Sequence, residues 1–278
     1  WSLYRGQTGM EITSSTGNSP ATIGDSQPYV NLGTLAGNPI EVKKVETGRE
    51  FSCAILENDM VKCWGRNQYG KLGYELGSNI NLGDQVGEMG DNLPYVDFGT
   101  IDTVKDLSLG ENYACVIRSD DKVFCWGRGA YGVLGQEHSN DIGDNAGEMG
   151  VNLIETQLGT NLTPVKLAAG LRSMCALFSN GIAKCWGYNA NGQLATGDLS
   201  TKGHLPGHMG GNLDFVNIDS QKKIVDIKAG FYHFCALLED NGIKCWGLNG
   251  FGELGIGHHF DMGGDVFTVG DNIPLTAP

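Results

Sequence analysis

The strongest constraint in this sequence is an internal repeat of about sixty residues, marked by the string Cys-Trp-Gly. A Gly-x-Leu-Gly step follows most copies of the string, and one copy carries Ala195 in place of the last glycine. A unit of this size cannot bury a core alone and must stack on its neighbours. We therefore expect residues 1–278 to form one domain. Its repeat units are predicted at approximately 1–47, 48–109, 110–169, 170–229 and 230–278.

Each repeat carries two short apolar segments separated by a polar turn, which is the pattern of a β-hairpin. In the first hairpin these segments are 51–56 and 61–64. In the last two, Ser179-Asn180-Gly181 and Asp240-Asn241-Gly242 fit a three-residue turn whose final residue is left-handed, a conformation that favours glycine. No segment has the periodicity and caps of a helix. The repeat is therefore predicted to consist of β-strands.

The eight cysteines fall into four pairs, each with a separation of ten residues. Counting outwards from the turn places the two cysteines of a pair opposite each other, close enough for a disulfide. Metal ligation, the alternative, usually requires a closer Cys-x-x-Cys spacing. Four disulfides imply an oxidising compartment, so we expect an extracellular or cell-surface location. The predicted pairs are Cys53–Cys63, Cys115–Cys125, Cys175–Cys185 and Cys235–Cys245.

Further strands are expected in apolar segments outside the hairpins. Four short strands per repeat cannot bury both faces of their sheet unless neighbouring sheets stack on them, and a radial stack of such sheets is a propeller. The predicted fold class is therefore all-β, a β-propeller of four-stranded blades with roughly four complete blades. The additional strands are predicted at 42–45, 95–98, 104–109, 165–169 and 224–229.

The pattern Cys-Ala-Leu … Gly-x-x-Lys-Cys-Trp-Gly-x-Asn-x-x-Gly-x-Leu, clearest over residues 235–254, resembles the regulator-of-chromosome-condensation repeat. The resemblance covers nearly the whole chain and implies a propeller, usually of about seven blades. With about four blades, this chain would be either part of a larger propeller or a propeller with an unusual closure. The nuclear founder of the family exchanges nucleotide on a small GTPase. Other members are scaffolds, binding modules or secreted enzyme inhibitors, and the paired cysteines favour a secreted, disulfide-containing branch.

The chain is strongly acidic, with a formal net charge of −13. Nucleic-acid binding requires a basic surface, and the longest basic clusters are Lys43-Lys44 and Lys222-Lys223. No apolar segment approaches the length of a transmembrane helix. We therefore expect neither nucleic-acid binding nor membrane insertion. Because the chain begins at Trp1 without a methionine, we expect a processed product or a fragment.

The Gly/Asp-rich loops offer the best candidates for a metal site, because Ca²⁺ takes about six to eight oxygen ligands. Their spacing matches no EF-hand loop, and the alternative is a solvated loop whose polar groups bond to one another. In that alternative the recurring Asn92 and its counterparts are loop staples, residues whose side chains form hydrogen bonds with backbone groups of the loop. We expect no cofactor, with Ca²⁺ as the alternative. The candidate ligands are Asp84, Glu88, Asp91, Asp144 and Glu148.

Two groups of aromatic residues are expected to have different roles. The recurring tryptophans, at 1, 64, 126, 186 and 246, are predicted to pack between blades, with sugar stacking as the alternative. Tyr69, Tyr131 and Phe251 share a repeat position in the Gly-x-Leu-Gly loops. Equivalent positions in a propeller lie on one rim, so these three are predicted to be binding residues.

Catalytic motifs are missing from the sequence, including Gly-x-Ser-x-Gly, the phosphate-binding Gly-Lys-Ser/Thr loop and His-Glu-x-x-His. Polar groups that recur once per blade lie around a ring, whereas catalysis needs them in one pocket. We therefore expect no catalytic residue and no enzyme activity. Asn161 begins the glycosylation sequon Asn161-Leu162-Thr163, which the following Pro164 weakens.

The predicted function is that of an extracellular structural or protein-interaction module, part of a larger secreted or cell-surface protein. Its partners would be other proteins or further copies of itself, bound through rim loops. The alternatives are a lectin-like module that binds glycans and a secreted inhibitor that covers an enzyme's active site. Repeat-equivalent polar and aromatic loop residues would favour the lectin. A single non-repeating patch would favour the inhibitor.

The disulfide pairing can be tested directly by peptide mapping of the non-reduced protein. We expect the four links to join cysteines ten residues apart in the sequence. Each link closes a small loop, so reduction of one should lower the free energy of unfolding by about 2–3 kcal/mol. Free thiols, or links between different repeats, would contradict the prediction.

Overall fold

The computed structural model describes residues 5–12 and 24–276. Its repeats form four three-stranded antiparallel sheets, which we call blades 1 to 4, and a two-stranded sheet precedes them. No helix in the described ranges is long and apolar enough to cross a membrane. The strands are β1 (Thr34–Leu35), β2 (Asn38–Pro39), β3 (Val42–Thr47), β4 (Phe51–Leu56), β5 (Val61–Gly65), β6 (Val104–Leu109), β7 (Tyr113–Arg118), β8 (Val123–Gly127), β9 (Pro164–Ala169), β10 (Ser173–Phe178), β11 (Ala183–Gly187), β12 (Ile224–Ala229), β13 (His233–Leu238) and β14 (Ile243–Gly247). Short 3-10 turns are η2 (Gly24–Ser26), η3 (Gln68–Gly70), η4 (Gly90–Asn92), η5 (Ala130–Gly132), η6 (Gly150–Asn152), η7 (Gly210–Asn212) and η8 (Gly270–Asn272).

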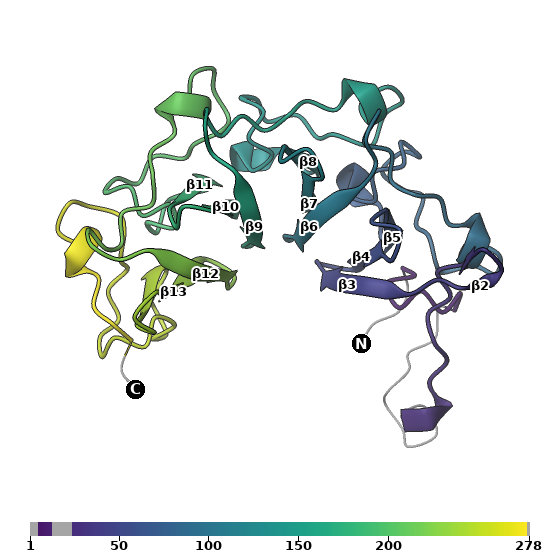
Figure 1. Ribbon diagram of the computed structural model, residues 1–278, viewed down its shortest axis with the longest axis horizontal. Helices are drawn as coiled ribbons and strands as arrows, with labels where there is room; N and C mark the ends of the chain where they lie inside the picture. Colours follow the sequence, from purple (N-terminus) through teal and green to yellow (C-terminus); the bar gives the residue numbers. More distant parts are fainter. Residues whose placement is uncertain (1–4, 13–23, 277–278) are drawn as a thin grey trace.

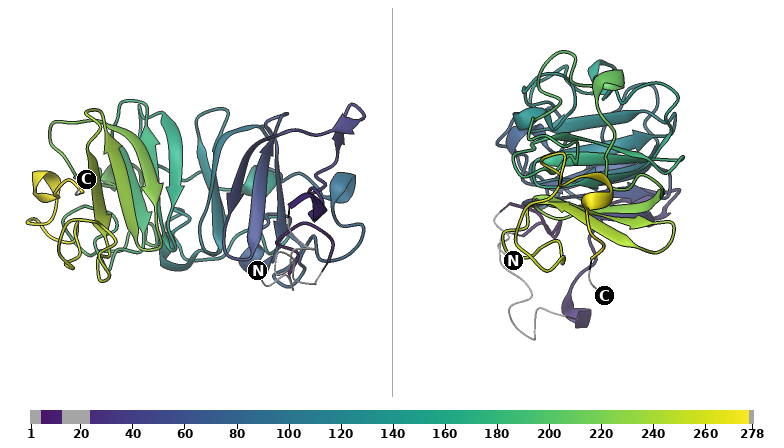
Figure 2. Two further views of the ribbon diagram at one scale, coloured as in Figure 1. Left: turned by 90° about the horizontal axis from the view of Figure 1, so that it is seen from below. Right: turned by 90° about the vertical axis from the view of Figure 1, so that its left-hand side faces the viewer.

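The four blades stand side by side in an open arc (Figure 1). The first strand of each blade, β3, β6, β9 or β12, lies innermost. The strands run between two loop-bearing faces (Figure 2). One face carries the turns that join the first and second strands of each blade, and the other carries the hairpin turns between the second and third strands. The predicted all-β propeller class is therefore confirmed.

The cysteine pairs lie where the hairpin register predicts them. Cys53 faces Cys63 in blade 1, and the equivalent cysteines face each other in every blade. Each pair is joined by a disulfide, with Cα atoms 4.0 to 4.1 Å apart. The turn of blade 4 differs from the prediction by one residue, because the left-handed residue is Asn241 (φ 68°) and not Gly242. Asparagine tolerates this conformation. Because the turn ends at Asn241, the hairpin of blade 4 has the same register as those of the other blades.

The predicted fourth strand is reduced to a single bridge in blades 2 to 4 and to one hydrogen bond in blade 1. In blade 1 the N–H of Val96 donates to the carbonyl of Val61 (2.9 Å), but residues 95–98 form no strand. The reason is that the carbonyl of the next residue, Asp97, accepts from the N–H of Gly150 in the following repeat (3.2 Å). Because its backbone is shared between two blades, this segment joins the blades and does not extend one sheet.

Tryptophan packing joins each blade to the one before it. Trp126, Trp186 and Trp246 are 0% exposed. The indole N–H of each donates to a backbone carbonyl in the Gly-x-Leu-Gly loop of the preceding blade, or in the equivalent loop with Ala195, at 2.8 to 3.1 Å. A Cβ atom on Gly73 would lie 2.8 Å from the Trp126 Nε1, so glycine allows the closest approach at this position. The prediction that the tryptophans pack between blades is confirmed for these three residues.

Residues 5–12 supply blade 1 with the same kind of loop. Trp64 is buried against them, since a Cβ on Gly9 would lie 2.9 Å from its Nε1. The N–H of Glu11 donates to the carbonyl of Gly83 (3.0 Å), just as that of Glu75 donates to Gly143. Residues 5–12 of the predicted repeat unit 1–47 therefore contact blade 1 as the Gly-x-Leu-Gly loop of blade 1 contacts blade 2. Trp1 lies outside the described residues.

A glutamate at the end of these loops reaches the outer loop of the next blade. The Glu75 carboxylate accepts from the N–H groups of Glu148 and Met149, both at 2.6 Å. The equivalent Glu11 and Glu137 each accept an N–H bond from the methionine at the same repeat position, Met89 and Met209. Blade 3 has Gly197 at this position, so the contact between blades 3 and 4 has no such carboxylate.

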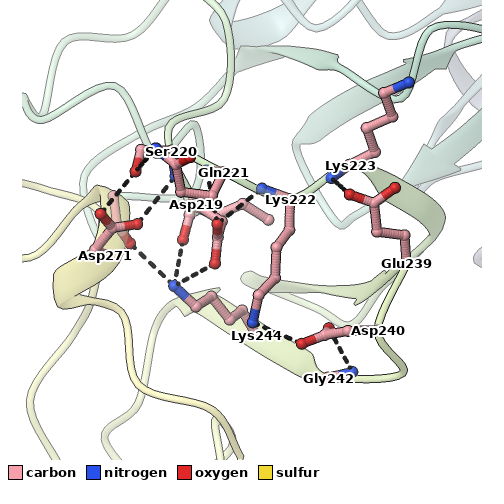
Figure 3. A network of polar contacts seen from close by, with 12 residues as sticks. Asp219, Ser220, Gln221, Lys222, Lys223, Glu239, Asp240, Gly242, Lys244 and Asp271 are labelled. Carbon is pink, nitrogen blue, oxygen red and sulfur yellow. Dashed lines mark hydrogen bonds and ion pairs between the residues drawn. The ribbon is translucent and has the colours of Figure 1, made fainter.

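A buried lysine ties the outer loop to the third strand of three blades. In blade 4, Lys244 Nζ donates to the carbonyls of Ile218 (2.7 Å) and Gly270 (3.3 Å) and pairs with Asp219 at 3.2 Å (Figure 3). Bonds to backbone carbonyls satisfy an ammonium group that burial deprives of water. The equivalent bonds run from Lys62 to Gly90 and from Lys184 to Gly210.

Blade 4 is the least covered of the four. Its second strand, β13, alternates buried and half-buried residues, whereas β4 and β10 are buried along their whole length. Cys235 is half-buried, although the equivalent cysteines of the other blades are 0% exposed. In blades 1 to 3 the following blade covers this surface. Among the described residues, no segment covers β13 as the following blades cover β4 and β10.

Replacement of one tryptophan tests how strongly the blades depend on this packing. We expect Trp126→Ala to lower the free energy of unfolding by about 3–5 kcal/mol, because it leaves a large cavity. Trp126→Phe keeps much of the volume but leaves the Lys71 carbonyl without its donor, and should cost about 1–3 kcal/mol. Urea unfolding followed by circular dichroism measures both. Phe267→Ala, at an 81% exposed position, is the control, and an equal loss there would contradict the packing role.

Candidate protein-binding face

Two sets of loops form one face of the arc. The first set joins the first and second strands of the blades, and the second set follows the Cys-Trp-Gly strings. Backbone bonds connect the sets in every blade, as in the bond from Arg128 N–H to the Asn112 carbonyl (2.9 Å). We call this surface the arginine face, since it carries four of the six arginines in the sequence. Its segments are 47–50, 109–112, 169–172 and 229–232 in the first set, and 66–69, 128–131, 188–191 and 248–251 in the second.

A chain of backbone hydrogen bonds links the inner turns across the blades. The N–H of Arg49 donates to the carbonyl of Glu111 (3.1 Å), and that of Glu111 donates to Leu171 (3.4 Å). Leu171 in turn donates to the carbonyl of Phe231 (2.8 Å). A glycine precedes each of these residues, and at Gly110 an added Cβ would lie 1.9 Å from the Tyr113 ring. The four turns are therefore held at fixed positions around the axis of the arc.

The inner turns surround a hollow of about 550 Å³. The hollow is lined by three residues from each blade, 47–49, 109–111, 169–171 and 229–231. Most of its side chains are apolar, and the charged ones are Arg49 and Glu111. Phe231, at its edge, is 72% exposed. The hollow therefore offers apolar surface with a charged group on one side.

The four equivalent positions at this hollow carry four different chemistries. Arg49, Glu111, Leu171 and Phe231 occupy the same place in successive turns. Positions that hold the blades together repeat, as the tryptophans do. These positions are equally fixed by the backbone but do not repeat in side chain. The result is one asymmetric patch on a repetitive scaffold.

Glu111 is shared by two arginines. Its side chain is 8% exposed, and one carboxylate oxygen lies 2.5 Å from Arg49 Nη1. Its other oxygen lies 3.6 Å from Arg172 Nε. The hydrogen bond that Arg49 donates to Glu111 raises the pKa of Arg49 above its usual value. One carboxylate facing two guanidinium groups leaves a net positive charge beside the hollow, and the Arg49 side chain is 64% exposed.

An aromatic row extends from the hollow across blades 2 to 4. The guanidinium of Arg172 stacks 5.1 Å from the centre of the Tyr131 ring and donates to its hydroxyl (3.2 Å). Tyr131 packs edge-on against Tyr188 at 5.1 Å, and Tyr188 lies 6.0 Å from Tyr232. Such contacts hold long side chains in one conformation before a ligand arrives.

Arg128 and Tyr69 make a second arginine–aromatic pair, between blades 1 and 2. The guanidinium of Arg128 lies 4.9 Å from the centre of the Tyr69 ring. None of the ion pairs among the described residues includes Arg128. Its charge is therefore available to a ligand on this face.

A buried lysine lies directly beneath the arginine face. Lys71 is 0% exposed, and its Nζ donates to the carbonyl of Arg49 (2.6 Å) and to the Asn112 Oδ1 (3.0 Å). Burial in this position lowers the pKa of Lys71 to about 7. Its two acceptors belong to the inner turns of blades 1 and 2. Lys71 therefore braces the two turns that carry Arg49 and Glu111.

The three binding residues predicted from the sequence lie at equivalent places but in different surroundings. Tyr131 is part of the aromatic row, and Tyr69 is half-buried beneath Arg128. Phe251 is 91% exposed and lies in blade 4. The structure thus places Tyr131 and Tyr69 on the arginine face with arginine partners, and it does not bring the three together.

The predicted calcium ligands accept hydrogen bonds within their own loops or from another repeat. The Glu148 carboxylate accepts backbone N–H bonds from Gly143, Asp144 and Asn145, and Glu88 does the same in the preceding repeat. Burial alone would raise the pKa of Glu148, but these bonds outweigh it and lower the pKa. Asp91 accepts from the N–H of Thr34 (2.6 Å). Over residues 5–12 and 24–276, no three His, Cys, Asp or Glu side chains gather in a group that could hold a metal ion.

Two further sequence predictions concern asparagines. Asn92 and Asn212 donate from Nδ2 to the carbonyls of Gly87 and Gly207, at 2.9 and 3.2 Å, so they act as the predicted loop staples. Asn161 is exposed and left-handed, with φ 60°, in the turn before β9. Its glycosylation stays a prediction.

The sequence-based search missed most of the arginine face. Arg49, Glu111, Arg172 and Phe231 are about sixty residues apart in the sequence and meet only when the blades stack. A signal was nevertheless present. Each lies one or two residues after the glycine that follows the first strand of a blade. This glycine recurs in all four blades, whereas the residue after it differs from blade to blade. Such a difference at one position of a repeat indicates that the position does not hold the blades together.

The hollow combines groups that suit binding. The described residues that line it provide one carboxylate, one guanidinium and the hydroxyl of Thr47, together with backbone amides of glycine. This arrangement can bind a side chain and a charge at once.

The hairpins match a known repeat. The sequence profile of the regulator of chromosome condensation (RCC1) repeat matches four segments, residues 42–71, 104–133, 165–193 and 224–253. Each segment begins at or next to the start of the first strand of a blade and ends in the Gly-x-Leu-Gly loop or its equivalent. The repeat therefore coincides with the blade of the structure.

The chain is also similar to curated proteins and to solved structures. The chain is 26% identical over 226 residues to the ultraviolet-B receptor UVR8 of Arabidopsis thaliana, covering 80% of this chain and 45% of the relative. It is 28% identical over 214 residues to the human E3 ubiquitin-protein ligase HERC2, covering 75% of this chain and 4% of the relative. The fold is similar to that of Prp20p from Saccharomyces cerevisiae, with TM-score 0.60 and 21% identity over 90% of this chain and 56% of that one. Human WBSCR16 gives TM-score 0.63 with 17% identity over 98% and 61%. The chain thus spans less than half the length of these two curated relatives.

The buried Lys71 predicts a pH dependence of stability. Because its pKa is about 7 in the folded protein and about 10.5 when unfolded, the unfolded chain binds more protons between these values. The free energy of unfolding should therefore rise with pH from 7 to 9, by up to about 1.4 kcal/mol per pH unit from this group. Lys71→Met should remove that slope, whereas the exposed Lys105→Met should keep it. Urea unfolding at several pH values gives the slopes, and equal slopes in the wild type and Lys71→Met would contradict the prediction.

Proposed function

We propose that this chain, which belongs to the regulator of chromosome condensation repeat family, is an extracellular protein-binding module whose contact surface is the arginine face. The observation that carries the proposal is the non-repeating patch around the hollow. Its backbone is fixed by hydrogen bonds between blades, while its side chains are free to differ. A ligand that contacts all four blades meets a different group on each, which gives one orientation of binding.

The asymmetry of the patch favours a protein over a glycan. Repeated binding of sugar units would use similar residues in every blade, whereas Arg49, Glu111, Leu171 and Phe231 differ. A protein surface is itself asymmetric and can match such a patch. The lectin-like alternative is therefore less well supported. An inhibitor that covers an enzyme's active site would use the same patch and is one form of the proposed function.

The composition of the face suits a protein interface. Arginine and tyrosine are enriched among the residues that contribute most to binding, in part because their large side chains lose little conformational entropy when already ordered. Arg172, Tyr131 and Tyr188 are held against one another in the free protein. Two solved structures with this fold describe protein partners, Kap60 bound to yeast RCC1 (Prp20) and the binding of Prp20p to Gsp1p and histones.

The four disulfides support the extracellular location. One lies in the hairpin of every blade. Disulfides persist in oxidising compartments and are rare in the cytosol or nucleus. The curated relatives are longer than this chain, which fits a module within a larger secreted or cell-surface protein. No enzyme activity is proposed for the module.

Selection of ligands from a displayed peptide library tests the proposal without a known partner. We expect selected peptides to bind the wild-type chain and to bind Tyr131→Ala or Phe231→Ser at least about tenfold more weakly, since each is an anchor on the face. Phe267→Ser is the matched control, as Phe267 is an exposed phenylalanine on an outer loop. Peptides that bind all three variants equally, or a selection that yields no binder, would count against the proposal.

A further inference from the structure

We infer that the segment recognised by the arginine face is an acidic peptide with one aromatic or large aliphatic anchor. The inference rests on the proposed function and specifies the chemistry of the partner. Its starting point is the distribution of charge. The sequence has a net charge of −13, yet the eight segments of the arginine face hold four arginines, two glutamates and no lysine or aspartate.

The two glutamates do not neutralise the face. Glu50 pairs with Arg66 at 2.6 Å. Glu111 lies between Arg49 and Arg172, so two guanidinium groups share one buried carboxylate. Arg128 stacks on an aromatic ring and takes part in no ion pair within the described ranges. Two positive charges therefore remain without a carboxylate of their own, one beside the hollow and one between blades 1 and 2.

The charges on the arginine face affect a bound segment more than the net charge of the whole chain does. At physiological salt, charges more than about 8 Å apart are largely screened from each other. A short segment on this face therefore meets the arginines, while the acidic loops elsewhere have little effect. The guanidinium of Arg49 is exposed and keeps donors that Glu111 does not occupy, and guanidinium groups bind carboxylates with two parallel hydrogen bonds.

The hollow supplies the second element of recognition. Leu109, Leu171 and Phe231 line it together with alanine and glycine, and Arg49 lies at its edge. A volume of about 550 Å³ accommodates one large side chain together with part of the segment that carries it. An apolar residue in the hollow places its neighbours in the sequence beside Arg49. The geometry thus requires the anchor and the carboxylate to be close together in one segment.

Three displayed peptide libraries test this inference directly. Each has a central Phe, Trp or Leu, and the flanking positions are restricted to Asp and Glu, to Lys and Arg, or to Asn and Gln, with Ser and Gly in all. We expect binders from the acidic library at least about tenfold more often than from the other two. Replacing Asp and Glu by Asn and Gln in the best acidic peptide, or its central residue by Ala, should each weaken binding about tenfold or more.

Paired variants locate the charge effect on the protein. Arg49→Gln combined with Arg128→Gln should weaken the acidic peptide about tenfold or more, and higher salt should weaken it further. Lys43→Gln combined with Lys105→Gln removes the same charge from the opposite face and should change binding less than about twofold. Circular dichroism and urea unfolding establish that each variant is folded. An equal loss in both pairs would overturn the inference, because it would assign the effect to total charge.

The remaining outcomes separate this inference from the proposed function. If basic or neutral peptides bind and depend on Tyr131 and Phe231, the face binds proteins and the acidic assignment is wrong. If no library yields a binder, both proposals fail. A heparin oligosaccharide that bound the wild type and Phe231→Ser equally, and displaced the acidic peptide, would assign the arginines to a sulfated glycan and overturn the inference.

Discussion

The whole arc depends on one contact, the insertion of each blade's indole against the glycine loop of the blade before it. Three strands cannot bury both faces of a sheet, so the core of this protein lies between blades and not within them. The indole N–H of Trp126 finds its acceptor in the backbone of blade 1, which fixes the spacing of the two sheets. At Gly73 an added Cβ would lie 2.8 Å from the ring nitrogen of Trp126, whereas the equivalent loop of blade 3 accepts Trp246 with Ala195 in this place.

This arrangement separates stability from recognition. The groups that hold blades together lie in the interior and in the outer loops, and they recur in most repeats. The inner turns of the arginine face are fixed through their backbone, by the bonds from Arg49 to Glu111, Leu171 and Phe231. The side chains at these positions are therefore not needed to hold the blades together, and they can differ according to the ligand that the face binds. Lys71 is the exception, because it supports the face from the interior of the sheet stack.

Local chemistry explains which parts of the structure could be predicted from the sequence. The facing of Cys53 and Cys63 follows from the length of the turn between them. The packing of Trp126 follows from its place directly after Cys125, in the third strand of blade 2. The strand at 95–98 was wrong because its apolar pattern could not reveal that the Asp97 carbonyl bonds to the next repeat. The arginine face was missed for a similar reason. Its members are joined by stacking of blades, which leaves no pattern within any one repeat.

The contacts between successive blades are not equal. Gly197 leaves the contact between blades 3 and 4 without the carboxylate that Glu75 provides between blades 1 and 2. Among the described blades, local opening should therefore separate blade 4 more easily than the others. Because Phe231 and Tyr232 belong to blade 4, a ligand that spans the hollow from Arg49 to Phe231 would contact both blade 1 and blade 4. Its binding would stabilise blade 4 in its position relative to blade 1.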